Sequence, residues 1–320
     1  SRNIGFSIYS CNCWNDFIMM KKLLLILLCL PMIGFGQTLI PDADFEQALI
    51  NLGYDTGTPN GSVSTANINT VTDLNVSNQD ISDLTGIEDF SALMFSVAFS
   101  CSKNNLSSLD LSTNLLLFSL DAAENQLAFL NVSNNINLEG LGCEDNQLTS
   151  LDISNNINLE ELGCEDNQLT SLDVSNNMML DNLFCSQNNI TELDLSQCLV
   201  LEKLKCLSNQ LVCLHLKAGN NFASIDQINA TNNPQLSCVE VDSIGFFSSN
   251  PFNSFNFDAG VSFSNSCNNN CSGTTSIQEH IKNKELLKVT DLLGRETKQT
   301  NQPLFYIYDD GTVEKRIIIE

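Results

Sequence analysis

The sequence predicts a solenoid of short stacked coils built around a parallel β-sheet, and two observations carry that prediction. The first is a cysteine that recurs every 21 positions without a gap, at Cys143, Cys164, Cys185 and Cys206. Extended backwards, the same period reaches Ala122 and then Cys101. The second is the length of the unit: one such unit cannot bury its own apolar face, so neighbouring units must stack and share one core.

Each period also carries the pattern L-x-x-L-x-[L/C]-x-x-N-x-L, as in LEELGCEDNQL from Leu159 to Leu169. This pattern resembles the leucine-rich repeat. The resemblance implies a solenoid of 21-residue repeats with a parallel β-sheet, mostly β or irregular and without helices in the coils. A related phrase, SLDVSNN, occurs once more in each period. We therefore expect two short extended runs in every coil.

Three sets of equivalent residues are expected to form ladders inside the stack. The leucines are Leu141, Leu162, Leu183 and Leu204 on the first run, and Leu151, Leu172, Leu193 and Leu214 on the second. The asparagines are Asn104, Asn125, Asn146, Asn167, Asn188 and Asn209. A buried amide must meet its hydrogen bonds, so we expect these to bond backbone groups where the chain leaves the sheet. Because Ala122 occupies the cysteine position in one coil, we expect buried free thiols there and neither a metal nor a redox site.

A polar ladder is predicted on the second run, at Asp110, Asn131, Asp152, Asp173, Asp194 and His215. We expect solvated carboxylates that accept N–H bonds from the following turn. The alternative is calcium bridging Asp152, Asp173 and Asp194, because that ion favours clustered carboxylate oxygens. The sequence indicates no other metal or cofactor.

The first 36 residues read as a segment that precedes the mature chain. Residues 19–36, MMKKLLLILLCLPMIGFG, have the two lysines, apolar run and small final residues of a secretory signal peptide. The apolar run is too short to span a bilayer comfortably. We expect translation to start at Met19 or Met20, residues 1–18 to be a start-site artefact, and the mature chain from Gln37 to have no membrane span.

Residues 37–70 are expected to cap the N-terminal end of the solenoid. The phrase IPDADFEQALINLGY predicts a helix over 42–52 that ends before Gly53. Its apolar face is predicted to be Phe45, Ala48, Leu49 and Leu52. Asp44 and Gln47 have the spacing of a capping box. An open solenoid end exposes leucine side chains, so this helix is the candidate lid.

The repeats are expected to occupy 71–217, with a bulge near 93–99. After residue 217 the period is lost, and 218–271 is expected to cap the other end. The aromatic residues that would seal it are Phe246, Phe247, Phe252, Phe255, Phe257 and Phe263. Cys238 and Cys267 are the candidate disulfide of this cap, because an exported protein meets an oxidising compartment.

Residues 285–320 follow a linker-like stretch, 272–284, and contain three strand-like runs with turn signals between them. The informative residues are Lys288, Val289, Asp291, Gly294, Arg295, Phe305 to Tyr308, Asp310, Gly311 and the terminal KRIIIE. They resemble the type A C-terminal sorting domain of the Bacteroidetes type IX secretion system, without its usual upstream strand. The resemblance implies a Bacteroidetes leucine-rich repeat protein with a small C-terminal β-domain that the secretion machinery reads. Such a protein would be exported through the periplasm and be secreted or held at the outer cell surface. The alternative for this segment is a further irregular cap.

The charge distribution excludes some partners. The formal net charge is −24, and seven of the fourteen Lys and Arg residues lie from Lys282 onwards. Between residues 37 and 281 the only cations are Lys103, Lys203, Lys205 and Lys217. Phosphate recognition depends on Lys and Arg, so nucleic acid and anionic membranes are disfavoured as partners. Cationic ligands, calcium and basic protein surfaces remain.

Outward-facing positions of the first run indicate where a partner would bind. One lane is Asp121, Gly142, Gly163, Phe184 and Lys205; the lane beside it is Ala123, Glu144, Glu165, Ser186 and Leu207. Two glycines beside an exposed phenylalanine are expected to leave a shelf, with acids on one side. The predicted interaction surface comprises Asp121, Glu144, Glu165, Phe184, Lys203 and Lys205, because solenoids bind partners on such faces.

The predicted function is a secreted or cell-surface binding module for a protein or glycan, acting in protein–protein or adhesive interactions. A calcium-dependent structural or surface-coat protein is the first alternative. A glycan-processing enzyme is disfavoured. Glu144 and Glu165 would lie near the roughly 5 Å separation of a retaining glycosidase pair, but their similar surroundings offer nothing to separate the two pKa values. His215 and His280 are the only histidines and lie in no recognisable motif, so no catalytic residue is expected.

Overall fold

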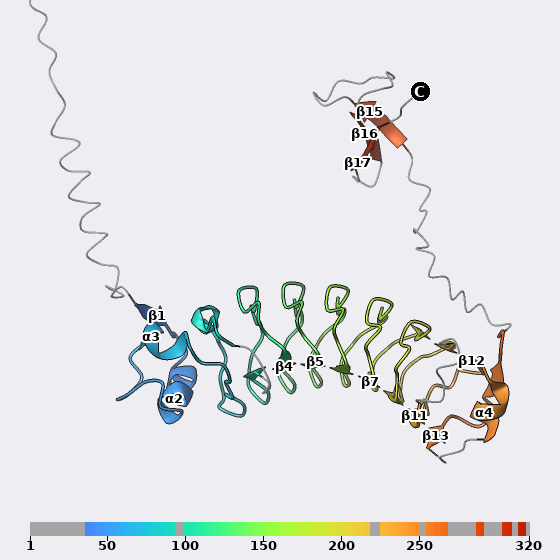
Figure 1. Ribbon diagram of the computed structural model, residues 1–320, viewed down its shortest axis with the longest axis horizontal. Helices are drawn as coiled ribbons and strands as arrows, with labels where there is room; N and C mark the ends of the chain where they lie inside the picture. The colour runs from blue at the N-terminus through green and yellow to red at the C-terminus, as the bar shows by residue number, and fades with distance from the viewer. Residues whose placement is uncertain are drawn as a thin grey trace, which may run out of the picture. The chain divides into compact units, whose positions relative to one another are not determined.

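The computed structural model describes residues 36–93, 99–217, 225–249 and 254–267, and the strand backbones of 286–290, 303–308 and 313–317. The chain divides into two compact units, Ser1–Cys271 and Ser272–Glu320. In the first unit the coils stack in a curved row, with the long sheet on the inner side of the curve (Figure 1). The expected signal peptide and linker, and most of the expected bulge, lie outside the described residues. Within those residues, no helix is long and apolar enough to cross a bilayer.

The N-terminal end is closed by a two-stranded sheet and short helices. Strand β1 (Gln37–Leu39) pairs antiparallel with β2 (Ser62–Ser64), and helix α2 (Ala43–Asn51) lies between them in the chain. Helix α3 (Thr65–Ile68) and the 3-10 helix η1 (Ile87–Asp89) then lead into the first coils. Their buried side chains, such as Phe45 and Leu49, belong to the same core cluster as Leu74 of the first coils.

The start of α2 differs from the prediction. The N-cap is Asp42, whose Oδ1 accepts the backbone N–H groups of Asp44 at 2.9 Å and Phe45 at 3.0 Å. The capping box expected from Asp44 and Gln47 is wrong, because the chain enters the helix two residues earlier. The other carboxylate oxygen of Asp42 accepts two N–H groups of the first coil and ties the helix to the stack.

The buried face of α2 is shorter than predicted. Phe45 and Leu49 are fully buried, and the Phe45 ring stacks on that of Phe90 with centroids 6.3 Å apart. Leu52, expected on this face, is the C-cap residue and is 45% exposed. The reason is that Gly53 turns the chain with φ of +82°, a conformation that favours glycine.

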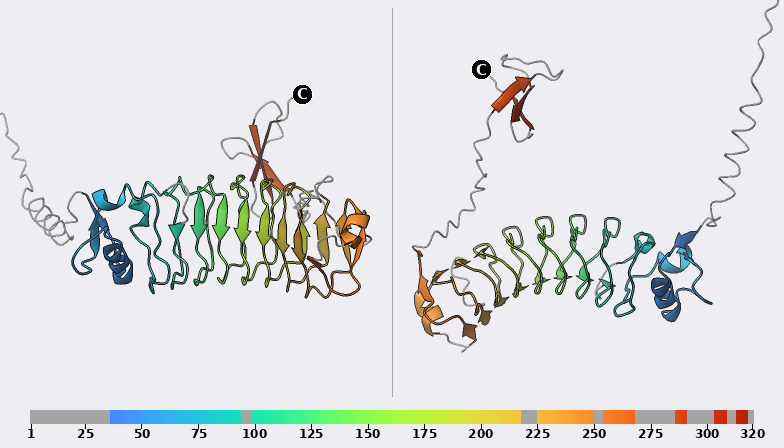
Figure 2. Two further views of the ribbon diagram at one scale, coloured as in Figure 1. Left: turned by 60° about the horizontal axis from the view of Figure 1, so that its bottom comes forward. Right: turned by 180° about the vertical axis from the view of Figure 1, so that it is seen from behind.

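A long parallel sheet runs through the stack (Figure 2). In spatial order its strands are β3 (Phe99–Ser100), β4 (Ser119–Asp121), β5 (Gly140–Gly142), β6 (Glu161–Gly163), β7 (Asn182–Phe184), β9 (Lys203–Lys205), β11 (Gln227–Asn229) and β13 (Phe255–Asn256). The middle residue of each three-residue strand points into the core. The register therefore stacks Leu120, Leu141, Leu162, Leu183 and Leu204 in one buried file.

The second run of the coil forms a sheet only towards the C-terminal end. Its strands are β8 (Glu192–Asp194), β10 (Cys213–Leu216), β12 (Cys238–Val241) and β14 (Ser262–Ser264), all parallel. In earlier coils the equivalent residues are turns and extended backbone, although Leu151 and Leu172 are still buried.

The stacking continues beyond residue 217, where the sequence period is lost. Ile228 pairs in register with Leu204, and Phe255 pairs with Ile228. The intervals along the chain are 24 and 27 residues instead of 21. The expected boundary between repeats and cap is therefore corrected: β11 to β14 belong to the stack and also close its end.

The asparagine ladder binds consecutive coils together, and the prediction of backbone bonding is confirmed. Asn146 Nδ2 donates to the carbonyls of Ala122 and Cys143 at 3.0 and 3.2 Å, and its Oδ1 accepts Leu127 N–H at 2.9 Å. The same pattern recurs in every coil from Asn104 to Asn209, and also at Asn233. Each turn is thus fixed to the coil before it.

The cysteine ladder is a column of buried free thiols, as predicted. Its members, each fully buried, are Cys101, Cys143, Cys164, Cys185 and Cys206. Ala122 and Ala230 occupy equivalent positions and are equally buried. Burial raises the pKa of the thiols, in the case of Cys206 to about 12, so they remain protonated and unreactive.

An aromatic cluster and a disulfide lie at the C-terminal end. Helix α4 (Ile244–Ser249) buries Phe247, whose ring stacks on Phe255 at 5.6 Å and lies 5.8 Å from Phe263. Cys238 and Cys267, the candidate pair, are joined in a disulfide. Cys213 is disulfide-bonded as well. Phe252 lies outside the described residues.

The second unit contains a small antiparallel sheet. Strand β15 (Leu286–Thr290) pairs with β16 (Pro303–Tyr308), which pairs with β17 (Val313–Ile317). The three strands coincide with the three strand-like runs of the sequence.

Candidate functional site

The outward face of the long sheet carries one row of predicted binding residues in strand register. Its members are Asp121, Gly142, Gly163, Phe184 and Lys205. The row continues to Ser100 at one end and to Asn229 at the other. Equivalent residues of neighbouring strands lie about 4.8 Å apart, so the row is one continuous surface.

Phe184 and Lys205 contact each other across β7 and β9. Lys205 Nζ lies 4.7 Å from the centroid of the Phe184 ring, within the range of a cation–π interaction. Phe184 was expected to be exposed, but it is partly buried, and the Lys205 side chain lies over its ring. The pair presents a positive charge above an aromatic ring.

The shelf expected at Gly142 and Gly163 is occupied by Glu144. A Cβ on Gly163 would overlap Glu144 Oε1 and lie 2.7 Å from its Cδ, and one on Gly142 would lie 3.1 Å from Oε2. The two glycines therefore allow the carboxylate of Glu144 to lie against the sheet. The prediction of an open shelf was wrong, because a side chain from the neighbouring lane fills it.

Glu144 and Glu165 occupy equivalent positions on consecutive coils, and the pKa of each is raised. For Glu165, burial is the largest cause and the Glu144 charge adds to it, while a backbone hydrogen bond and Lys205 oppose them; the resulting pKa is about 7. Burial likewise raises the pKa of Glu144, where nearby acids, Asp121 first, add to the effect. The charge of Glu165 therefore changes near neutral pH, and a bound cation would favour the ionised form of both carboxyls.

Two of the predicted residues lie at the margin of this arrangement. Asp121 is already engaged, because its Oδ2 accepts a hydrogen bond from Ser100 Oγ at 2.8 Å. Lys203 lies on the same strand as Lys205 but two residues earlier, in the lane on the far side from the carboxyl pair. The structure brings together Glu144, Glu165, Phe184 and Lys205.

The calcium candidates serve as turn caps. Asp152, Asp173 and Asp194 each accept the backbone N–H of the serine two residues later, at 3.0, 2.9 and 2.9 Å. Hydrogen bonds from the Ser154 side chain and backbone lower the pKa of Asp152. In the part of the chain that the structure describes, no three His, Cys, Asp or Glu side chains are grouped so that they could hold a metal ion.

A second asparagine ladder was missed from the sequence. Its members, nearly or fully buried, are Asn114, Asn135, Asn156 and Asn177. Asn156 Nδ2, for example, donates to the carbonyls of Val132 at 3.1 Å and Asn135 at 2.8 Å. The buried Cys198 occupies the equivalent position in the next coil. The signal was present as an asparagine that recurs every 21 positions.

An exposed apolar stripe was missed as well. We use this name for Leu115, Ile136, Ile157, Met178 and Leu199, which follow the second asparagine ladder by one residue in each coil. Their side chains are 52%, 54%, 57%, 51% and 41% exposed. The signal was an apolar residue repeated at a turn, where a solvated turn would have a polar one.

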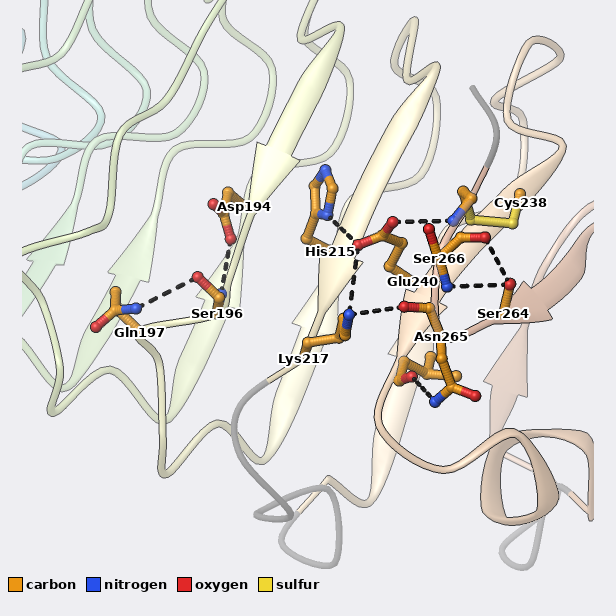
Figure 3. A network of polar contacts seen from close by, with 12 residues as sticks. Asp194, Ser196, Gln197, His215, Lys217, Cys238, Glu240, Ser264, Asn265 and Ser266 are labelled. Atoms are coloured by element: carbon orange, nitrogen blue, oxygen red, sulfur yellow. Dashed lines mark hydrogen bonds and ion pairs between the residues drawn. A yellow bond between two sulfur atoms is a disulfide. The ribbon is translucent and has the colours of Figure 1, made fainter. Parts of the chain in front are cut away.

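At the C-terminal end of the second sheet, a polar network surrounds Glu240 (Figure 3). Its Oε2 lies 3.1 Å from His215 Nδ1 and 4.0 Å from Lys217 Nζ. Its Oε1 accepts the N–H of Cys267 at 2.9 Å, beside the disulfide to Cys238. Glu240 therefore ties β10 to the final turn, a structural role.

Comparisons with known proteins show the fold. A scan of protein-family models and a search of curated proteins found no match. Among solved structures, internalin C2 from Listeria monocytogenes matches with a TM-score of 0.54 and 16% identity, over 71% of this chain and 95% of that one. A leucine-rich repeat protein from Leptospira interrogans has a TM-score of 0.44 and 22% identity, over 56% and 48% of the two chains. The functional domain of InlJ from Listeria monocytogenes, which includes a cysteine ladder, has a TM-score of 0.29 and 21% identity, over 69% of this chain and 70% of that one. At these identities the similarity concerns the fold alone, which is that of a leucine-rich repeat solenoid.

Proposed function

We propose that this chain is a binding module that holds a protein partner on the outward face of its long sheet. The observation that carries the proposal is the grouping of Phe184, Lys205, Glu144 and Glu165 on that face. An aromatic ring with a cation above it, beside two partly desolvated carboxyls, offers apolar contact and both signs of charge within a small area. Such groups supply much of the energy at protein interfaces.

The carboxyl pair indicates what the partner contributes. Burial raises the pKa of both Glu144 and Glu165, and the charge of Glu144 raises that of Glu165 further. A lysine or arginine of the partner placed between them would stabilise their ionised forms. We therefore propose that the partner inserts a basic side chain beside an apolar residue that packs on Phe184.

We propose no catalytic step. A retaining glycosidase pair requires one ionised and one protonated carboxyl, held apart in pKa by different surroundings. Here burial raises the pKa of both Glu144 and Glu165 in the same direction.

The test is a quantitative capture experiment on immobilised full-length chain with a surface extract of the producing organism. The double variant Phe184→Ala, Lys205→Ala removes the aromatic ring and the ammonium group above it. The matched control is Phe129→Ala, Lys103→Ala, since Phe129 is 65% exposed and Lys103 forms only an exposed ion pair with Glu124. We expect at least one captured protein to be lost by the first variant and retained by the control.

Equal capture by the wild type and by the Phe184, Lys205 variant would refute the proposed face. Capture of nothing above the level of bare resin would also count against a binding module. A partner retained equally by wild type and both variants would indicate a different surface of the solenoid.

We further infer that the module is exported. The lysine-flanked apolar run of residues 19–36 supports this, as does a C-terminal unit that forms a three-stranded sheet at the residues that resemble a type IX sorting domain. The disulfide between Cys238 and Cys267 supports it too, because such bonds persist in oxidising compartments.

Export has a direct test in the producing organism. N-terminal sequencing of the native protein is expected to begin at Gln37, in the medium or on the outer surface. A variant that lacks 285–320 is expected to stop in the periplasm. A native chain that retains Met19 inside the cell would refute export, and full secretion of the truncated chain would refute the sorting role.

A further inference from the structure

The apolar stripe is a periodic feature of the surface that the proposed function leaves unused. Its five members lie in the turns that precede β4, β5, β6, β7 and β9, four residues before β5 in the case of Ile136. Three neighbours widen it: Leu116, Met179 and Val200, which are 43%, 50% and 40% exposed. The eight side chains expose on the order of 600 Å² of apolar surface, the upper end of what a soluble monomer usually shows.

The stripe is held in place by hydrogen bonds between coils. Asn137 Nδ2 donates to the Leu115 carbonyl at 3.0 Å, and Asn158 Nδ2 to the Ile136 carbonyl at 3.2 Å. Beneath it, the buried asparagine ladder ties each turn to the one before. The apolar side chains are therefore presented on an ordered backbone, which lowers the entropy cost of binding.

An acidic lane runs beside the stripe, at the start of the long sheet. It consists of Glu139, Glu160, Asp181 and Glu202. Their backbones are bonded in series, because the N–H of each donates to the carbonyl of the previous one, at 2.7, 2.8 and 2.7 Å. Within the described residues, none of the four takes part in a salt bridge.

The acidic lane borders a hollow of about 290 Å³. Its acidic lining is Glu139, Glu160, Glu161 and Asp181. Partial burial, followed by the charge of Glu160, raises the pKa of Glu139. These carboxylates repel one another, so cationic groups placed in the hollow would be attracted to several charges at once.

The geometry of the lane favours one kind of occupant. Coils repeat about every 4.8 Å, and an α-helix laid along them presents a residue to the surface about every 5.4 Å. An extended strand presents one about every 6.7 Å and loses register with the coils sooner. Five coils span roughly 19 Å, which about 13 helical residues cover.

A second copy of this chain is disfavoured as the occupant, because it would bring the same acids and a net charge of −24 to the contact.

We propose that the apolar stripe and the acidic lane together dock a basic amphipathic α-helix of another protein. The apolar side of the helix packs on Ile136, Ile157 and Met178, and its lysines or arginines lie over Glu139, Glu160 and Asp181. This surface is separate from the grouping at Phe184 and Lys205, so the chain has two binding surfaces. The mode is that of an amphipathic helix that packs by its apolar side, with charge fixing its orientation.

The test uses two synthetic 18-residue helical peptides and the full-length chain at physiological salt. One peptide has leucines on one side and lysines on the other, and the second replaces every lysine by glutamate. Titration calorimetry is expected to show binding of the lysine peptide with a micromolar dissociation constant and no binding of the glutamate peptide. The triple variant Ile136→Ser, Ile157→Ser, Met178→Ser is expected to weaken binding at least about tenfold, since three apolar contacts are lost.

Matched controls distinguish binding at the stripe from non-specific apolar adsorption and from attraction to the overall negative charge of the chain. Phe129→Ser with Leu52→Ser removes exposed apolar side chains elsewhere, and its affinity is expected to match the wild type. Glu139→Gln with Glu160→Gln is expected to weaken binding about threefold or more, whereas Asp145→Asn with Asp166→Asn, which removes two charges outside the lane, changes it little. Phe184→Ala with Lys205→Ala is also expected to bind like the wild type.

Several results would overturn the proposal. Unchanged affinity in the triple stripe variant would show that the lysine peptide binds by charge alone. Binding by overall charge alone would also be shown if Glu139→Gln with Glu160→Gln and Asp145→Asn with Asp166→Asn weakened the affinity equally. A wild-type chain that is dimeric in light scattering, and monomeric after Ile157→Lys, would assign the stripe to a second copy. Binding to zwitterionic lipid vesicles, lost in the triple variant while the peptide does not bind, would assign it to a membrane.

Discussion

Glu144 lies folded against Gly163, which pairs with Gly142 on the next strand of the long sheet. The contact is so close that a Cβ at position 163 would overlap the carboxylate. Glycine at this position thus determines where a charged side chain of the candidate binding face rests. Glu144 is partly buried in this position, and burial is the largest cause of its raised pKa.

Replacement of Gly163 by alanine should move Glu144 without unfolding the protein. The group in the way is the end of a flexible side chain, so we expect the free energy of unfolding to change by less than about 1 kcal/mol. The pKa of Glu165 should fall, because the Glu144 charge moves away and water gains access. Titration of the Glu165 side-chain carboxyl by NMR in both proteins measures this.

Gly86 provides the contrasting control. It has φ of +104°, and a Cβ there would lie 2.6 Å from the Leu39 carbonyl oxygen, which is backbone and cannot move aside. Gly86→Ala should therefore destabilise the N-terminal cap by about 2 kcal/mol or more. Similar effects of the two substitutions on stability would contradict the assigned role of Gly163.

The raised pKa of Glu165 makes stability depend on pH. Its ordinary value is 4.5 and its value in the folded chain is about 7. Between these values the folded chain binds more protons than the unfolded chain, so this group lowers stability as pH rises from about 4.5 to 7. Because Glu165 is partly exposed, solvent screening reduces the effect to about 1 kcal/mol.

Glu165→Gln should remove that loss. We expect the variant to exceed the wild type in urea midpoint at pH 8 and to match it near pH 4.5. Glu192→Gln, which removes one charge from an exposed strand position, controls for net charge. A Glu165→Gln advantage that is the same at both pH values would be incompatible with a titration near neutral pH.

The repeat was predictable from the sequence because its core positions recur with a strict period. Leu141, Cys143 and Asn146 each have an equivalent 21 residues away, and only stacked coils satisfy all three at once. The period predicted the file of leucines, the buried thiols and the bonded amides together. It failed where the spacing changes: Ile228 continues the sheet, but extra residues before it hide the register.

The details of the face were less predictable, for a physical reason. Periodicity assigns a position to the outward face but does not say where a long side chain comes to rest. Glu144 therefore fills a space that appeared open, and Phe184 is covered by its neighbour Lys205. The apolar stripe was not predicted, because a turn between coils is expected to carry polar residues. The exposed Ile157 shows that this turn is not.

The buried asparagine side chains should contribute more to the free energy of unfolding than exposed asparagine side chains do. Asn167 Nδ2 donates to the carbonyls of Cys143, Cys164 and Glu165, and its Oδ1 accepts one backbone N–H. Asn167→Ala leaves these buried groups without partners and should cost about 2–4 kcal/mol. Asn155→Ala removes a single exposed bond to the Ser133 carbonyl and should cost less than about 1 kcal/mol. Urea denaturation compares them, and equal losses would argue against the ladder as a main tie between coils.

The cysteine column should behave as inert packing. Cys143 and Cys164 are fully buried, and burial raises the pKa of both thiols. We expect a maleimide reagent to label them only as fast as the solenoid unfolds, because the thiolate is the reactive form and it is both inaccessible and rare. Mass spectrometry of labelled peptides, with and without urea, follows each position separately.

Cys164→Ala should lower the free energy of unfolding by about 1 kcal/mol, since alanine already occupies this position at Ala122 and Ala230. Rapid labelling of Cys164 in the folded chain, or a loss far above that for alanine, would mean that the column does more than fill the core.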